Sequence, residues 1–248
     1  MSLYSIFIQH LLTHTSGLGE YDAEPIPEYQ GKQIYDSDVV GILSKKKMLD
    51  SIPGEKYFYN NGGFCLLKLI VEKISKQDFR DFLQENIFGP LRMKTTLPNQ
   101  EAVIVIPNRA YGYSEKDGEW LRTDQRQTST TIGDGGIYSS IHDLALWSEI
   151  VQSGKILSPE MKALMLTKHV LTDEGPEIYY GFGVFLKEEN GKLVAYHGGS
   201  TIGFEIGIYY ALTERMTFVF LSNITGEHGS VKIAQLAEEY LSDSHSSV

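Results

Sequence analysis

The chain has 248 residues, 42% of them apolar, which fits one large or two small globular domains, and its net charge of −10 disfavours a nucleic-acid partner. The single cysteine, Cys65, excludes an internal disulfide and a cysteine-based metal cluster. No apolar run approaches the roughly 20 residues of a membrane span and the N-terminal stretch lacks secretory-signal features, so the cellular compartment stays open.

The first segment of interest, residues 10–17, has the sequence HLLTHTSG and a helical pattern. His10 and His14 are four residues apart, so on a helix they share a face and one metal ion would bridge them. The zinc-protease pattern, however, requires a glutamate directly after the first histidine, where this chain has Leu11. We favour a structural histidine at 14, and the metal interpretation lacks a third ligand.

Residues 36–165 have a mostly helical pattern, with apolar residues recurring every three or four positions. They include Phe64, Leu67, Ile70, Val71, Ile74, Phe79, Phe82 and Leu83, and in the segment from Asp36 to Met48 they are Val39, Val40 and Leu43. Helix starts are predicted at Ser158-Pro159-Glu160 and at Ser140, where Asp143 would complete a capping box. We interpret the lysine run at 45–47 as a solvated helix face.

After residue 177 the sequence changes to short β-rich runs. We predict antiparallel strands at 180–186, 192–197, 204–210 and 216–222, with Glu189-Asn190-Gly191 as one of the connections. A last amphipathic helix, capped by Ser230, would pack on this sheet through Val231, Ala234, Leu236 and Tyr240. The expected architecture is α+β or mixed α/β, with a helical subdomain at about 10–170 and a sheet with its C-terminal helix at about 176–248.

Three glycine-rich turns carry candidate catalytic groups. Tyr59 and Asn61 follow the Pro53-Gly54 turn and stand on a predicted loop just before a helix. His197 is predicted at a strand end, followed by Gly198, Gly199 and Ser200, whose first two members lack a Cβ and allow a ligand to approach the backbone. The third turn, GDGG at 133–136, contains Asp134, which we interpret as fixing the turn.

Six segments in order resemble one known family. HLLTHTSGL, PGEKYFYNNGGF, GDGGIYSSIHDLALW, YGFGVF, HGGSTIGF and VFLSN are similar to segments of the serine β-lactamase and penicillin-binding-protein family, in its class C-like branch with D-alanyl-D-alanine carboxypeptidases and esterases. The resemblance runs from Ile6 nearly to the C-terminus. It implies a single β-lactamase-like domain over residues 1–248 that acts on amides or esters and needs no cofactor or metal.

The resemblance also implies roles for the candidate residues. Tyr59, in the family's Tyr-x-Asn motif, would be the general base and proton relay, and the Asn61 amide would orient the substrate. His197-Gly198-Gly199 matches the family's Lys/His-x-Gly motif, so His197 would hold the substrate carboxylate or the proton network. The N–H of Ser200 would supply half of the oxyanion hole.

The family's nucleophile is not found at its expected place. Relatives carry a Ser-x-x-Lys helix several dozen residues before HLLTHTSG, where this sequence has nine residues. One Ser-x-x-Lys occurs in the chain, at Ser44 to Lys47, and we attribute it to chance because three consecutive lysines suit a solvated surface. Cys65-x-x-Lys68 is interpreted as helix filler.

These observations leave three hypotheses. The first is a serine hydrolase acting on a D-Ala-D-Ala peptide, β-lactam or ester, of which this chain is an N-terminally truncated and inactive form. The second is a non-catalytic homologue that binds peptidoglycan-like ligands, and the third is the histidine-based metal protein. If the N-terminal strands and nucleophile helix are missing, one sheet edge should be unpaired and an apolar face uncovered, which would favour self-association.

Overall fold

A six-stranded antiparallel sheet forms the centre of the computed structural model, which describes residues 4–22, 26–46, 48–99, 105–153, 155–226 and 229–245. Its strand order is β10-β9-β8-β7-β6-β5. The strands are β5 Val170–Leu171, β6 Tyr179–Tyr180, β7 Phe185–Glu189, β8 Lys192–Thr201, β9 Phe204–Ala211 and β10 Met216–Ser222. The predicted antiparallel sheet is confirmed, with the first predicted strand divided into β6 and β7.

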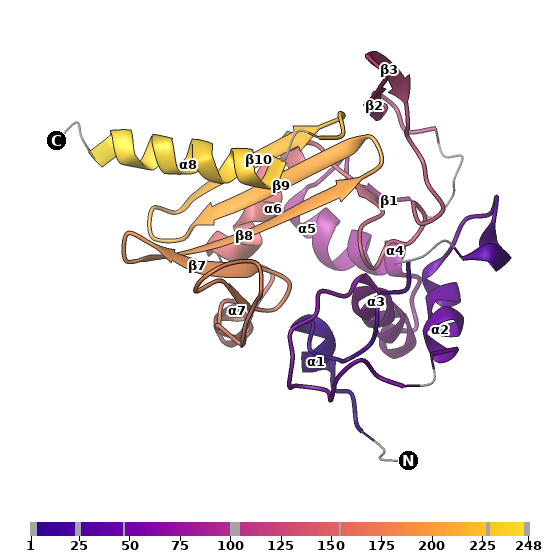
Figure 1. Ribbon diagram of the computed structural model, residues 1–248. Coiled ribbons are helices and arrows are strands. Elements are labelled where there is room, and N and C mark those ends of the chain that lie inside the picture. Colours follow the sequence, from indigo (N-terminus) through magenta and orange to yellow (C-terminus); the bar gives the residue numbers. More distant parts are fainter. Residues whose placement is uncertain are drawn as a thin grey trace.

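Successive side chains along the strands point to opposite faces of this sheet, and both faces are buried. Ala195 and Tyr210 face helix α6 (Ile141–Ser153) and pack with its Val151, whereas Val194 and Tyr209 face helix α8 (Gly229–His245). Figure 1 shows α8 along one face of the sheet and α6 on the other. Two buried faces explain why the strands contain few charged residues at their centres.

Tight turns connect these strands. Asn190 and Gly191 link β7 to β8, and both have positive φ, 51° and 74°, as a two-residue turn of the type that matches strand twist requires. β8 is longer than predicted: it runs through Gly198, Gly199 and Ser200 to Thr201, because these residues continue to pair with β9. His197 therefore lies inside a strand rather than at its end.

The N-terminal half packs as helices beside one end of the sheet. They are α1 Ile8–Leu12, the 3-10 turn η1 Pro27–Tyr29, α2 Asp36–Ser44, α3 Asn61–Ser75, α4 Phe79–Leu83, the π-helical η2 Gln84–Phe88 and α5 Gly89–Leu91. Val39 and Leu43 of α2 pack against Tyr21, Ile34 and Cys65 in one core cluster. Val40, assigned to the same apolar face, is 45% exposed.

The helical prediction is wrong for residues 92–140, where the described parts form strands and loops. β1 (Leu97–Pro98) pairs with β4 (Ile137–Tyr138), and β2 (Tyr113–Lys116) pairs with β3 (Glu119–Arg122). Asp117 and Gly118, both with positive φ, close the second pair. An Asp-Gly pair between short strands is a strong hairpin signal, and it overrides the weak helical periodicity.

The later helices begin where predicted, but one detail differs. Ser158 caps α7 (Pro159–Met165) by accepting the N–H of Met161. Ser140 likewise accepts the N–H of Asp143, but the Asp143 carboxylate does not complete a capping box. It accepts hydrogen bonds from the hydroxyls of Thr95 and Thr96 instead, and so ties α6 to the chain before β1.

Helix α8 covers the sheet with a narrower face than predicted. Ile233 and Ala237 are buried against the strands, whereas Val231, Leu236 and Tyr240 are more than half exposed. The Ser230 side chain, predicted as its cap, lies outside the described atoms. Helix α8 therefore carries exposed apolar side chains.

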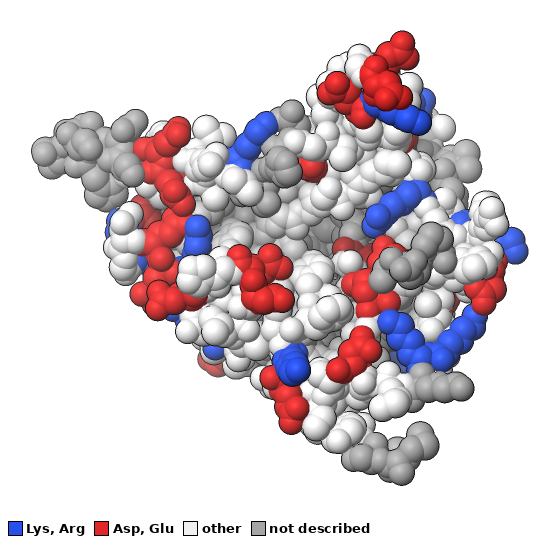
Figure 2. Space-filling model, in the orientation of Figure 1, with Lys and Arg blue, Asp and Glu red and all other residues white. Residues whose placement is uncertain are grey.

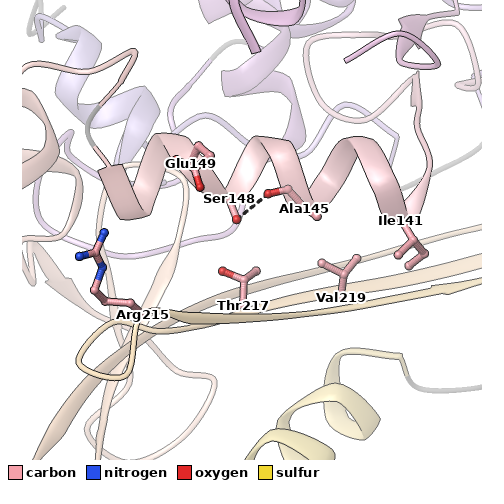
Figure 3. A pocket seen from close by; sticks show the side chains of 7 residues that line it. All are labelled: Ile141, Ala145, Ser148, Glu149, Arg215, Thr217 and Val219. Carbon is pink, nitrogen blue, oxygen red and sulfur yellow. Dashed lines mark hydrogen bonds between the residues drawn. The ribbon is translucent and has the colours of Figure 1, made fainter. Parts of the chain in front are cut away.

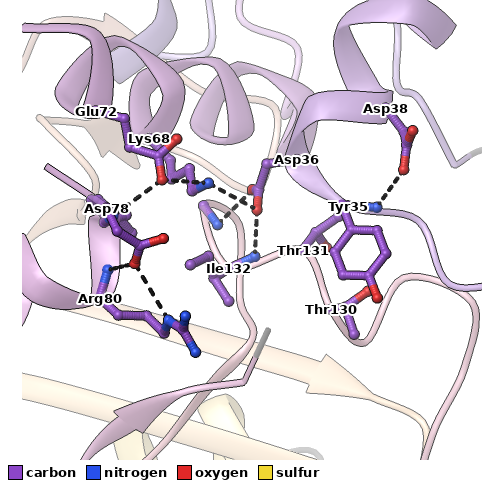
Figure 4. Close-up of polar contacts among 12 residues, drawn as sticks. Tyr35, Asp36, Asp38, Lys68, Glu72, Asp78, Arg80, Thr130, Thr131 and Ile132 are labelled. Atoms are coloured by element: carbon purple, nitrogen blue, oxygen red, sulfur yellow. Dashed lines mark hydrogen bonds and ion pairs between the residues drawn. The ribbon is translucent and has the colours of Figure 1, made fainter. Parts of the chain in front are cut away.

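The interpretation of Lys68 as helix filler is wrong. Its side chain is buried and its ammonium lies 2.9 Å from the Glu72 carboxylate and 3.9 Å from that of Asp36 (Figure 4). Asp36 in turn accepts the N–H groups of Ile132 and Gly133. This buried network connects α2 and α3 to the GDGG turn, so it positions residues that border the candidate site.

Strand β10 forms one edge of the sheet within the described residues, and β5 forms the other. Beside it, a groove of about 330 Å³ separates the strand from α6. Figure 3 shows Thr217 and Val219 of β10 facing Ala145 and Ser148 across this groove.

Charge on the surface is mixed. Figure 2 shows acidic side chains near α8 and on the β2–β3 hairpin, with lysines and arginines dispersed between them. Lys45 and Lys46 are exposed as predicted, but they follow α2 rather than lie on it, and Lys47 is outside the described residues. No described helix is long and apolar enough to cross a bilayer.

Candidate active site

A cavity of about 180 Å³ lies where the sheet meets α3. Seven residues from four separate parts of the chain line it: Tyr59, Asn61, Phe64, Asp134, Tyr180, Gly183 and His197. The three candidates assigned to catalysis from the sequence are thus together, although 138 positions separate the first from the last (197 − 59). Such a convergence of polar groups in one concave site is what a substrate pocket requires.

The start of α3 aims Tyr59 and Asn61 at this cavity. Asn60 is the N-cap, and its side-chain oxygen accepts the N–H of Gly63 at 2.7 Å while its amide donates to the Leu18 carbonyl. The Asn61 N–H donates to the Glu20 carboxylate at 2.7 Å. Asn61 is therefore the first residue of the helix rather than a loop residue, and these bonds leave its side-chain amide directed to the cavity.

A continuous hydrogen-bond chain runs behind the cavity through Tyr180. The Tyr180 hydroxyl lies 3.1 Å from Nε2 of His14 and 3.0 Å from Nε2 of His197. At the outer ends, Nδ1 of His14 accepts the Asn60 N–H at 3.0 Å, and Nδ1 of His197 lies 2.7 Å from the Gly198 carbonyl. Both rings of the pair are therefore fully engaged.

Backbone groups at the two ends fix the donor-to-acceptor direction of this hydrogen-bond chain. Nδ1 of His14 must be unprotonated to accept an N–H, so in the neutral ring Nε2 carries the proton and donates to Tyr180. Tyr180 then donates to Nε2 of His197, whose Nδ1–H donates to the Gly198 carbonyl. Each of the three side chains thus has one defined protonation state.

Burial keeps these groups neutral. It lowers the pKa of His14 to about 3, with a smaller contribution from His197, and it also lowers the pKa of His197. The pKa of Tyr180 is raised well above its usual value by burial and by the neighbouring tyrosines. His197 thus presents a neutral imidazole at the cavity wall, held by two hydrogen bonds.

Tyr59 stacks on His14, with ring centroids 4.1 Å apart. No hydrogen bond to its hydroxyl is found among the residues that the structure describes, and the same holds for the Asn61 side-chain amide. Burial raises the pKa of Tyr59 to about 12, and the negative charges of Asp134 and Glu20 add to this effect. A phenol used as a base here needs a cation beside it, and no lysine or arginine is among the lining residues.

Asp134 reaches the cavity from the GDGG turn. A Cβ on Gly133 would lie 2.6 Å from the Cα of Cys65, so this turn packs directly on α3 and only glycine fits. The Tyr21 hydroxyl donates to the Asp134 carboxylate at 2.8 Å. Burial raises the pKa of Asp134 to about 6.

The remaining candidates lie beside the cavity rather than in its wall. Gly198 contributes the carbonyl that holds His197, whereas Gly199 and Ser200 are exposed and pair with Ile206 and Glu205 of β9. Tyr180, which joins the two histidines, was treated only as a strand residue in the sequence. Its position two residues after Ile178, at the start of YGFGVF, carries no local signal of this role.

The geometry does not favour the metal interpretation. Both ring nitrogens of His14 are engaged, and Nδ1 of His10 accepts the Phe7 N–H. No group of three His, Cys, Asp or Glu side chains suited to a metal ion is found in the described part of the chain. His14 is instead the satisfied structural histidine predicted from the sequence.

Ser44 lies away from the cavity. It is exposed at the end of α2, and its hydroxyl donates to the Gly41 carbonyl at 2.9 Å. A nucleophile must reach a carbonyl carbon held between Tyr59, Asn61 and His197, and Ser44 is not among the residues that line this space. Its Ser-x-x-Lys spacing is consistent with chance, as interpreted from the sequence.

Comparison with known proteins identifies the family. The family model described as Beta-lactamase matches residues 5–241. The chain belongs to the β-lactamase family. Penicillin-binding protein 4* of Bacillus subtilis (strain 168) is 28% identical in an alignment over 233 residues that covers 88% of this chain and 51% of that protein.

Two further relatives of this β-lactamase-family chain are informative. The D-aminopeptidase of Brucella canis is 26% identical over 187 residues, covering 75% of this chain and 35% of that protein. The octameric penicillin-binding protein homologue from Pyrococcus abyssi superposes with a TM-score of 0.80 at 26% identity, covering 95% of this chain and 55% of the other. The chain thus spans about half or less of the length of these relatives.

Proposed function

We propose that the cavity at Tyr59, Asn61 and His197 is the acyl-transfer cleft of a serine hydrolase that acts on an amide or ester carbonyl. The observation that carries this proposal is the convergence of a phenol, a primary amide and an oriented imidazole on one cavity, with the first two lacking hydrogen-bond partners among the described residues. Free donors that face a pocket are suited to a substrate carbonyl and its leaving group.

The substrate is proposed to be a compact D-amino-acid peptide or amide, a β-lactam or an ester. The cavity of about 180 Å³ suits the reacting part of such a compact ligand. The relatives named penicillin-binding protein and D-aminopeptidase support the same range of substrates.

These 248 residues are proposed to supply the cleft without its nucleophile. Ser44 provides the one Ser-x-x-Lys of the sequence and is exposed outside the cavity. The raised pKa of Tyr59 supports the same view, because a catalytic phenol needs a neighbouring cation that the lining residues do not provide.

Covalent labelling tests whether these 248 residues lack the nucleophile. The purified chain is incubated with a fluorescent penicillin and a fluorophosphonate probe and then analysed by intact-mass spectrometry, with a penicillin-binding protein as the positive control. We expect no covalent adduct on this chain. Stoichiometric labelling, above all at Ser44, would overturn the proposal that the nucleophile lies elsewhere.

Non-covalent binding tests the cleft itself. D-phenylalaninamide is titrated into isotope-labelled protein, and we expect shifts of Tyr59 and His197 resonances that Asn61→Ala weakens. Asn86→Ala serves as the matched control because Asn86 is exposed on η2 and outside the cavity. Binding that leaves Tyr59 and His197 unchanged would contradict the proposed cleft.

The edge strand β10 is proposed as a self-association surface that takes the β10 strand of a second copy. An edge strand that carries Val219 and the exposed Leu221 is a template for such pairing. Sedimentation velocity over a concentration series should show dimers, and Val219→Lys should abolish them. A monomer at all concentrations would refute this surface.

A further inference from the structure

The candidate cleft has an unusual charge balance for its size. Of the seven lining residues, Asp134 is the one that carries a formal charge, since His197 is held neutral by burial. No lysine or arginine lines the cavity, and within the described ranges no ion pair joins Asp134 to a cation. The carboxylate therefore faces the substrate space with neutral donors as its partners.

The protein holds this carboxylate in a fixed position. The Tyr21 hydroxyl, itself buried, donates to Oδ2 of Asp134 at 2.8 Å. Tyr21 is in turn 3.2 Å from the Thr131 hydroxyl, and the Gly136 N–H donates to the Thr131 carbonyl at 2.9 Å, which closes the turn around Asp134. A preorganised acceptor loses little entropy when a ligand binds, so it is well suited to recognition.

The surrounding charge favours a cation in this position. Glu20 accepts the Asn61 N–H beside the cleft, and the negative charges of both Asp134 and Glu20 raise the pKa of Tyr59. A ligand carboxylate placed beside Asp134 would meet a like charge, whereas an ammonium group would gain a charge-assisted hydrogen bond.

We propose that the Asp134 carboxylate binds an ammonium group of the substrate, so that the cleft selects amino-acid amides or esters with a free amine over their deaminated or N-acylated counterparts. This inference rests on the proposed function, because it assumes that the carbonyl group lies at Tyr59 and Asn61. Asp134 is then a specificity-determining residue, with the amine at the GDGG turn and the reacting carbonyl at Tyr59 and Asn61.

The test compares two ligands of nearly equal shape. D-phenylalaninamide carries an ammonium group, and 3-phenylpropanamide lacks it. Binding is measured by isothermal titration calorimetry at pH 6.5, where an α-amine of pKa about 7.7–8.0 is charged. We expect wild type to bind the amine at least about tenfold more tightly. Asp134→Asn should reduce this preference to about twofold or less by weakening only the charged ligand.

A matched variant separates a direct contact between Asp134 and the ammonium group from the long-range electrostatic effect of a negative charge. Glu174→Gln removes the same charge from an exposed residue that acts electrostatically on Tyr59 but does not line the cavity. It should retain the tenfold preference. If Glu174→Gln lowers the preference as much as Asp134→Asn does, the proposed contact is refuted.

The outcomes distinguish this inference from the proposed function. Equal binding of the two ligands to wild type overturns the role of Asp134 and leaves the cleft in place. Failure of both ligands to bind overturns both proposals. The wild-type comparison needs no variant, so the inference is testable even if Asp134→Asn fails to fold.

Discussion

Tyr180→Phe removes a single hydroxyl, and with it both hydrogen bonds that join His14 to His197. The phenyl ring stays, so no packing volume is lost. Nε2–H of His14 is left without an acceptor at a site only 2% exposed, which costs about 1–3 kcal/mol. His197 borders the cavity, where water can replace the lost donor, so its share is about 0.5–1.5 kcal/mol.

The expected loss of unfolding free energy is therefore about 1.5–4.5 kcal/mol. Urea unfolding at pH 7, followed by far-UV circular dichroism, measures it as a shift of the midpoint at constant slope. Tyr57→Phe is the matched control. Its ring contacts both His14 and Tyr180, but its buried hydroxyl has no hydrogen-bond partner among the described residues.

Tyr57→Phe should be neutral or slightly stabilising, because it removes a buried hydroxyl that lacks a partner. Nitrogen-15 NMR of the histidine rings adds a second measurement: wild type should show the Nε2–H tautomer for His14 and Nδ1–H for His197. A Tyr180→Phe variant within about 0.5 kcal/mol of wild type, or the opposite tautomers, would refute the hydrogen-bond chain.

Three further predictions concern buried charge and reactivity. The pKa of His14 is lowered to about 3, so its contribution to the free energy of unfolding is complete above pH 6.5 and is lost as the pH falls towards 3. Acidification from pH 7 to pH 5 should therefore lower the free energy of unfolding by about 2 kcal/mol. The pKa of Asp134 is raised to about 6, so Asp134 stabilises the fold as the pH falls, and Asp134→Asn should make the loss of stability in acid steeper. Urea unfolding at pH 7 and pH 5 measures both effects. A stability that does not change between these pH values would contradict both predictions. Lys68→Met should lower the free energy of unfolding in urea by about 3 kcal/mol because it leaves Asp36 buried without its cation. Lys73→Met, on the exposed face of α3, should change it by less than about 0.5 kcal/mol. Equal effects of the two substitutions would refute the buried network. Cys65 is fully buried with a raised pKa, so iodoacetamide at pH 8 should modify it only in urea, and rapid labelling of native protein would contradict its placement.

The sheet was predictable from sequence because its strands are local patterns bounded by turn residues. Alternation and the Asn190-Gly191 pair placed β7 and β8, and Ser158-Pro159 placed the start of α7. The Asp117-Gly118 hairpin was missed because residues 113–122 were included in one long segment interpreted as mostly helical, although the periodic apolar residues of that segment end at Leu83. The turn signal for this hairpin was present in the sequence and received too little weight.

The misinterpreted polar residues have a different cause. Lys68, Asp143 and Tyr180 each have partners more than a dozen positions away: Asp36 for the first, Thr95 for the second, His14 for the third. In sequence they therefore resemble surface, capping and strand residues. The convergence of Tyr59, Asn61 and His197 was expected from family resemblance, since no spacing rule joins segments so far apart.

A ligand-bound structure tests the central claim most directly. Crystals of this chain are soaked with D-phenylalaninamide, and the position of the bound molecule is determined. We expect its carbonyl oxygen within hydrogen-bond distance of Tyr59 or Asn61, and its amine beside Asp134. A ligand that occupies the groove between α6 and β10, with the cavity at His197 empty, would contradict the assignment of this cavity as the acyl-transfer cleft.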